Sequence, residues 1–212
     1  MDKPQELKQI PQGAKMVPPT AIAVPFQSNA SSTYQNFLVT KALDANPNSY
    51  WESDYSLYKA NGDFDSQLNV PYKSALNMTT LDYPTFSQPI QTLGEWIQVK
   101  FASPVGIAGY AITVPSDTKY APSSWKLLVS YPEIWGNTWY AVHLVQNETR
   151  WASTVNRTIY YEIPSEISGY SLPIYRLVVT KTNGGGYVRI SDLSFNVQNV
   201  PGTFSRFVRD DT

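Results

Sequence analysis

The sequence predicts an all-β protein, an antiparallel eight-stranded jelly-roll β-sandwich with extended N- and C-terminal arms. Three observations lead to this prediction. Short, mostly apolar segments follow one another from residue 94 to residue 197. Turns rich in Pro, Asn, Gly and Ser separate these segments. No segment keeps helical spacing for about ten residues with a cap at each end. Many short strands with turns between them are typical of sandwiches and jelly rolls.

Composition favours one large domain and excludes several functions. The chain has 212 residues, 42% hydrophobic and 14% aromatic, which is enough to bury a full core. Its 16 Lys and Arg nearly balance its 17 Asp and Glu, and no long basic run occurs. Binding to nucleic acid or to an anionic membrane surface is therefore not expected. Cys is absent, so disulfides and thiolate metal sites are excluded.

We expect no export signal and no membrane insertion. Residues 1–26 carry charges and prolines where a signal peptide needs an apolar run. No stretch approaches the roughly 20 apolar residues of a membrane span.

Both ends of the chain are predicted to be arms that dock on a neighbouring protein. Residues 1–27 hold five prolines and read as an extended arm. The tail, residues 198–212, carries Phe204, Phe207 and Val208 after a Pro-Gly break, and we expect these three to contact a partner. The jelly-roll domain would span residues 28–197.

The predicted strands begin with "GEWIQVKF", residues 94–101. Trp96, Val99 and Phe101 alternate there with polar residues, and Ile97 breaks the strict period of two, as in a strand covered partly on both faces. Further strands are expected at 105–114, 124–131, 138–146, 157–163, 174–181 and 187–197.

Residues 54–93 are predicted to form a long aromatic loop insertion. They contain six Tyr and Phe residues and three prolines without a long alternation. Loops of this length are uncommon and tend to be functional. Their aromatic side chains could form a satellite core or an exposed binding surface, and we favour the core.

Four aromatic residues fall at strand positions where they would fill the sandwich interior: Trp96, Trp125, Trp139 and Tyr175. Trp135 and Trp151 lie nearer to turns, which makes them the better candidates for an exposed platform, although we favour packing for these two as well.

Several segments together resemble a known family. They are "ALDANPNSYWES", "GEWIQVKF", "VGIAGYAIT", "PSSWKLLVSY" with "GNTWY", "IYRLVVTK" and "VRISDLSFN". In order and spacing they resemble the discoidin-like family, also called coagulation factor V/VIII type C domains, whose fold is a galactose-binding-like jelly roll. The resemblance covers roughly residues 28 to 197. The most similar variant is that of structural proteins of large DNA viruses of algae and protists.

The resemblance implies a structural calcium ion held by "ALDANPNSYW". By position, its ligands would be oxygens of Lys41, Asp44, Asn46, Ser49 and Asp192. Hard oxygen ligands of this kind suit Ca²⁺, which takes six to eight of them. The alternative is that Asp44 only caps a turn through the local backbone. In either case the segment would tie the first strand to the last.

Two functions remain. The first is a minor capsid protein of the virion, which binds other capsid proteins or copies of itself through its arms and loops. The second is a carbohydrate-binding module. The loop residues that could bind a glycan are Tyr55, Tyr58, Trp135, Asn137, Arg150 and Trp151.

An enzyme is not expected, nor is any required cofactor. The single histidine, His143, lies in the alternating segment "AVHLV". We therefore expect it to be a hydrogen-bonded residue of a sheet rather than a general base. No Gly-x-Ser-x-Gly sequence occurs. The segment "TNGGGY" lacks the Lys-Ser/Thr of a phosphate loop and is predicted to be a hairpin turn.

Overall fold

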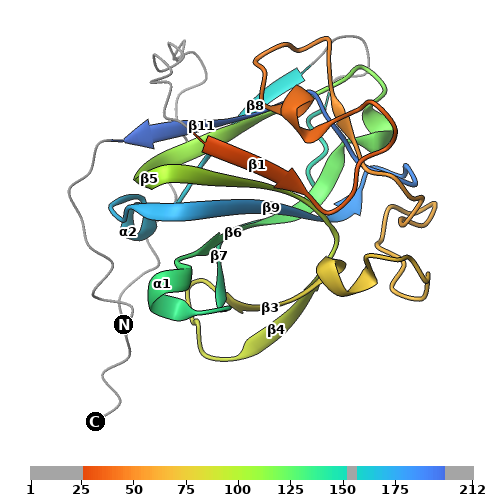
Figure 1. Ribbon diagram of the computed structural model, residues 1–212. Coiled ribbons are helices and arrows are strands. Elements are labelled where there is room, and N and C mark those ends of the chain that lie inside the picture. Colours follow the sequence, from red (N-terminus) through yellow and green to blue (C-terminus); the bar gives the residue numbers. More distant parts are fainter. Residues whose placement is uncertain (1–25, 152–156, 199–212) are drawn as a thin grey trace, which may run out of the picture.

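The structure, a computed structural model, describes residues 26–151 and 157–198. These residues form a β-sandwich with short helical turns at its edges, so the predicted fold class is confirmed (Figure 1). The strands are β1 (Phe26–Ala30), β2 (Trp51–Glu52), β3 (Asn77–Asp82), β4 (Pro89–Leu93), β5 (Glu95–Val114), β6 (Pro122–Ser130), β7 (Trp139–Val145), β8 (Arg157–Glu162), β9 (Leu172–Thr182), β10 (Arg189–Ile190) and β11 (Asp192–Gln198). The helical turns are η1 (Val39–Ala42), η2 (Lys73–Leu76), η3 (Thr118–Tyr120), α1 (Pro132–Trp135) and α2 (Ser165–Ser168).

The long strand β5 belongs to both layers of the sandwich. Its first half pairs with β1 and β9, and its second half pairs with β8 and β11. The register against β9 shifts between Lys100 and Val105, where the strand leaves the first layer. The sequence predicted two strands here, and the structure joins them into one.

The larger layer has the order β1-β5-β9-β6-β7-β3-β4. Its last two strands come from the insertion at 54–93, which was expected to be a loop. β3 pairs with β4 antiparallel and with β7 parallel, so the sheet is mixed rather than purely antiparallel. The insertion therefore widens the sheet. Most of its aromatic side chains pack against the core, as predicted, and Tyr55 is 43% exposed.

The four aromatic residues expected in the interior divide between two clusters. Trp125 and Tyr175 lie in the main core between the layers. Trp96 and Trp139 lie in a smaller cluster on the other face of the large layer, which corrects the prediction for these two. The reason is the period of two along β5: Ile97 and Val99 face the core, so Trp96 faces outward.

The arms lie almost wholly outside the described residues. Phe204, Phe207 and Val208 fall beyond them, so their predicted contacts with a partner stay a prediction. Within the described part of the chain, no helix has the length and hydropathy of a membrane span.

Candidate functional site

Two loops close against each other at the end of the sandwich where β5 and β9 finish. The loop at 183–188 follows β9, and the loop at 115–121 follows β5. The Gly185 amide donates a hydrogen bond to the Lys119 carbonyl at 2.7 Å. A Cβ on Gly185 would lie 2.7 Å from that same oxygen, so only glycine permits this approach. The loop leads to β10, which pairs with β2, and β9 does not pair with β10. The predicted hairpin turn is therefore wrong, because the chain crosses to another strand pair.

These two loops, together with Tyr50 before β2 and Arg189 at the start of β10, build a surface that we call the tyrosine–arginine rim. It is formed by Tyr50, Lys119, Tyr120, Tyr187 and Arg189. The Tyr120 and Tyr187 rings stack with their centroids 4.1 Å apart and their planes 7° from parallel. The Arg189 guanidinium carbon lies 4.5 to 5.1 Å from the centroids of the three tyrosine rings. These distances are within the range of cation–π attraction.

The position of Arg189 is fixed by a buried carboxylate. Its Nε lies 2.6 Å from Glu52 Oε2, and the Glu52 side chain is only 6% exposed. Its Nη2 donates to the Tyr187 hydroxyl at 3.2 Å. Burial opposes the charge on Arg189, but the interaction with Glu52 outweighs it and raises the pKa of the guanidinium.

The phenol groups of the rim differ in acidity. The hydrogen bond from Tyr187 and the one from Lys119 lower the pKa of Tyr120, while burial raises the pKa of Tyr187. The Lys119 ammonium lies 4.6 Å from the Tyr120 ring centroid. The rim thus combines aromatic surface with fixed hydrogen-bonding groups, which is the chemistry needed to stack on a sugar ring and bind its hydroxyls.

Two of the residues predicted to bind a glycan are buried. Tyr58 is 5% exposed, and its hydroxyl donates to the Val179 carbonyl at 2.8 Å. Trp151 is 8% exposed, and its indole N–H donates to the Pro122 carbonyl at 2.8 Å. Both side chains therefore support the core.

The other four predicted residues lie on separate elements. Trp135 is half-buried in α1 and packs edge-on against Tyr140 at 4.7 Å, while Asn137 is exposed in the following turn. Tyr55 is exposed after β2, where it contacts Tyr72. The structure does not gather the six residues into one exposed patch.

Arg150 forms a salt bridge with Glu148 of the same loop. Its Nη2 forms a salt bridge of 2.5 Å with Glu148, whose side chain is 4% exposed. Burial of Glu148 opposes its ionisation, but hydrogen bonds from the Arg150 side chain and amide and from the Tyr161 hydroxyl lower its pKa to about 2. This pair anchors the chain beside the core.

Sequence reasoning missed the rim, because its residues lie in segments interpreted as turns and a strand. Tyr120 belongs to "SDTKYAPS", and Tyr187 directly follows the three glycines of "TNGGGY". An aromatic residue next to a glycine-rich turn could have suggested an exposed site.

The predicted calcium ligands, in contrast, do converge. The Ser49 hydroxyl contacts Asp44 Oδ2 at 2.8 Å, the Asn46 carbonyl at 3.1 Å and the Lys41 carbonyl at 3.2 Å. The Asn46 amide also donates to Asp44 Oδ1 at 2.9 Å, so the turn-capping role expected as the alternative is present as well.

Asp192 faces the same loop from the last strand. Burial raises its pKa, hydrogen bonds from Ser194 and from the Ala45 backbone lower it, and the negative charge of Asp44 raises it further. A cation between Asp44 and Asp192 would relieve this repulsion, so the oxygen donors fit Ca²⁺. No described cluster contains three or more His, Cys, Asp or Glu side chains placed to bind a metal, so such an ion would depend on carbonyl and hydroxyl oxygens too.

His143 hydrogen-bonds inside the sandwich. Its Nδ1 lies 2.9 Å from the hydroxyl of the buried Tyr110, which also accepts a hydrogen bond from the Trp125 indole at 2.8 Å. Burial lowers the pKa of His143. This is the hydrogen-bonded sheet residue that the sequence predicted.

Comparisons with known proteins bear on the fold. No family model matches the sequence, and no curated protein matches it. One similar structure is a family 89 glycoside hydrolase from Clostridium perfringens in complex with 2-acetamido-1,2-dideoxynojirmycin. It superposes with a TM-score of 0.51 at 13% sequence identity, and the match covers 84% of this chain and 14% of that one. The CBM32-1, CBM32-2 and M60 catalytic domains of Clostridium perfringens ZmpB superpose with a TM-score of 0.50 at 12% identity, over 82% and 14%.

A third structure is chitosan-binding module 2 from a Paenibacillus chitosanase/glucanase in complex with chitotriose. It superposes with a TM-score of 0.49 at 15% identity, over 82% of this chain and 98% of that one. The chain spans only 14% of the first two structures' own length. The fold is the discoidin-like, galactose-binding-like jelly roll that the sequence resembles. These three structures are bacterial proteins, so the viral variant stays a prediction.

Proposed function

We propose that this protein is a non-catalytic carbohydrate-binding module that holds its glycan at the tyrosine–arginine rim. The observation that carries the proposal is the stacked pair of Tyr120 and Tyr187 beside Arg189 and Lys119. Aromatic rings present an apolar face to a pyranose, and the neighbouring charged groups hydrogen-bond its hydroxyls.

The polar groups at the rim come from two parts of the chain, the 115–121 loop and the start of β10. Lys119 and Arg189 supply donors, and Asp117 supplies a carboxylate whose Oδ2 lies 3.9 Å from Arg189 Nη1. Because Glu52 already holds the guanidinium, little order has to be gained on binding. A preformed site of this kind suits a rigid ligand such as an oligosaccharide.

Similarity of fold supports carbohydrate binding in general, without reference to the rim. One superposable structure includes CBM32 domains, and another is a glycoside hydrolase bound to an iminosugar. The capsid function expected from the sequence depended on arms outside the described residues, and the comparisons do not support it. We therefore propose carbohydrate binding in its place.

Replacing Tyr187 with alanine tests the proposal. The wild-type protein should bind at least one oligosaccharide on a glycan array, and titration calorimetry of that oligosaccharide should show binding about tenfold weaker for Tyr187→Ala, because one ring of the stack is lost. Tyr187→Phe should keep most of the affinity.

Tyr55→Ala is the control, because it removes a tyrosine that is 43% exposed and lies outside the rim. Binding should be unchanged. Loss of binding with Tyr55→Ala but not with Tyr187→Ala would move the site to the insertion, and a wild-type protein that binds no glycan would overturn the proposed function.

We also propose that Ca²⁺ stabilises the loop of Asp44 and Ser49. At a concentration about 100 times its dissociation constant, an ion that binds only the folded state adds about 2.7 kcal/mol. For a domain of this size, that corresponds to a rise in melting temperature of about 5–10 °C. Differential scanning fluorimetry with Ca²⁺ and with EDTA measures it.

The variant Asp44→Asn separates the metal from the turn. Asn forms the same turn with its side-chain oxygen but lacks the charge, so the calcium-dependent rise should disappear. Asp65→Asn is the control, because Asp65 Oδ1 accepts a hydrogen bond from the Gln67 amide in a similar turn. Equal melting temperatures of the wild type with and without Ca²⁺ would show that the loop is only a turn.

A further inference from the structure

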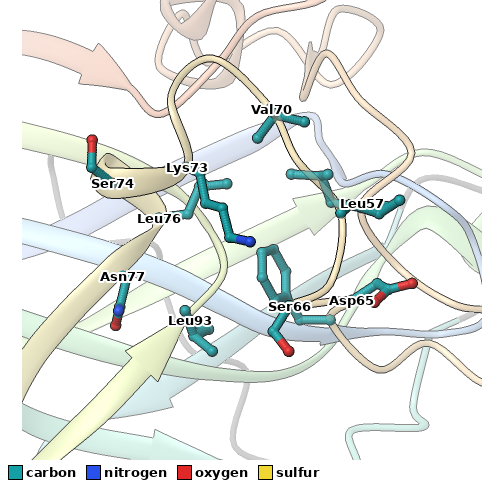
Figure 2. A pocket seen from close by; sticks show the side chains of 11 residues that line it. Leu57, Asp65, Ser66, Val70, Lys73, Ser74, Leu76, Asn77 and Leu93 are labelled. Atoms are coloured by element: carbon teal, nitrogen blue, oxygen red, sulfur yellow. The ribbon is translucent and has the colours of Figure 1, made fainter.

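The insertion encloses a hollow that the rim does not use. Its volume is about 250 Å³. It is surrounded by the segment before η2, by η2 itself, by the start of β3 and by the end of β4 (Figure 2). The lining residues include Leu57, Asp65, Val70, Lys73, Leu76 and Leu93. Every one of them lies within the 54–93 insertion, so the hollow is a product of that segment.

The walls of the hollow are mostly apolar. Leu57 and Leu76 are each 1% exposed and Val70 is 8% exposed, so they form a fixed base. Leu68 is 41% exposed, which leaves apolar surface uncovered at this site. An apolar cavity of about 150 Å³ is large enough to bind benzene. The hollow therefore has room for a ring with a short chain.

One positive charge lies at the edge of this hollow, on the exposed side chain of Lys73. Figure 2 shows the Lys73 side chain extending from η2 toward the hollow that it helps to line. Lys73 forms no salt bridge with any residue in the described ranges. The carboxylate in the lining, Asp65, instead lies 3.9 Å from Lys59 and accepts a hydrogen bond from the Gln67 amide.

We propose that this hollow binds a small molecule that has an apolar body and a carboxylate group. The apolar body would pack against Leu57, Leu76 and Leu93, and the carboxylate would pair with the Lys73 ammonium. An ammonium without a salt-bridge partner at the edge of an apolar hollow attracts an anion in preference to a neutral or cationic group. The apolar lining also distinguishes this site from the rim, and the proposal does not depend on glycan binding.

Three probes with the same body test the proposal: 4-phenylbutyrate, 4-phenyl-1-butanol and 4-phenylbutylamine. Titration followed by NMR of the leucine methyl groups measures each affinity and locates the site. We expect 4-phenylbutyrate to bind about tenfold more tightly than the alcohol, with shifts at Leu57, Leu76 and Leu93, and the amine to bind most weakly.

Variants of the exposed Lys73 assign the preference to its charge. Lys73→Met should remove the advantage of the acid over the alcohol, and Lys73→Glu should favour the amine. Lys100→Met, on the exposed part of β5, is the control and should bind like the wild type. Equal affinities of the wild type for acid and alcohol would overturn the role of Lys73. The absence of shifts at the three leucines with every probe would overturn the site itself.

Discussion

Replacing Arg189 with alanine should abolish glycan binding and lower the free energy of unfolding by about 3 kcal/mol. The loss of stability follows because the substitution leaves the Glu52 carboxylate, 6% exposed, without its partner. Removal of one member of a buried ion pair costs about 3–5 kcal/mol, and the 20% exposure of Arg189 places the expected value at the lower end. Urea denaturation gives the free energy, and calorimetry gives the affinity.

A double variant separates stability from function. In Glu52→Met/Arg189→Met, no charge is buried without a partner, and apolar side chains of similar length fill the space. Most of the stability should return, since a buried ion pair replaced by apolar residues is often neutral for stability. Glycan binding should stay lost, because the rim then lacks its guanidinium. Binding by the double variant at wild-type affinity would exclude Arg189 from the site.

Replacing Trp125 with alanine should lower the free energy of unfolding by about 3–5 kcal/mol, the usual cost of truncating a large core aromatic residue. Trp125 is 1% exposed, and the Tyr161 ring packs edge-on against it at 5.0 Å. The substitution leaves a cavity and also removes the indole donor to the Tyr110 hydroxyl. Urea denaturation followed by circular dichroism measures the change.

The matched comparison for Trp125 is Trp135→Ala, which truncates a half-buried tryptophan of α1. The loss of stability should be smaller than for Trp125→Ala, because the half-buried Trp135 side chain buries less apolar area on folding. Trp125→Phe should fall between the wild type and Trp125→Ala, since the ring that remains fills part of the cavity. Equal losses for Trp125→Ala and Trp135→Ala would contradict the assignment of Trp125 to the main core.

The local sequence predicted most of the strands from residue 94 onward, but it did not predict how the strands join and pair in the sheet. The alternation in residues 94–101 and 105–114 identifies both segments as extended, but it cannot show that they form one strand, β5, shared by two layers. The insertion has no long alternation, so β3 and β4 were missed. These strands are stable because β3 pairs with β7, which lies about 60 residues further along the chain.

The predicted calcium ligands and the rim also differ in how far the sequence alone could predict them. Four of the five predicted calcium ligands lie between Lys41 and Ser49, so a single segment holds most of the pattern. The rim joins Tyr50, Tyr120, Tyr187 and Arg189, which come from three distant parts of the chain. No local pattern marks them as neighbours.

By itself, the sequence determined the all-β class, the jelly-roll resemblance and the segment of the predicted calcium ligands, because each depends on the spacing of residues along the chain. Only the tertiary structure decided which aromatic side chains are buried and which lie together in the rim. It buried Tyr58 and Trp151, and it brought Tyr120 and Tyr187 together at the end of the sandwich. The physical reason is that the exposure of a loop side chain depends on what packs over it, and that packing is set by strand pairing between residues far apart in the sequence.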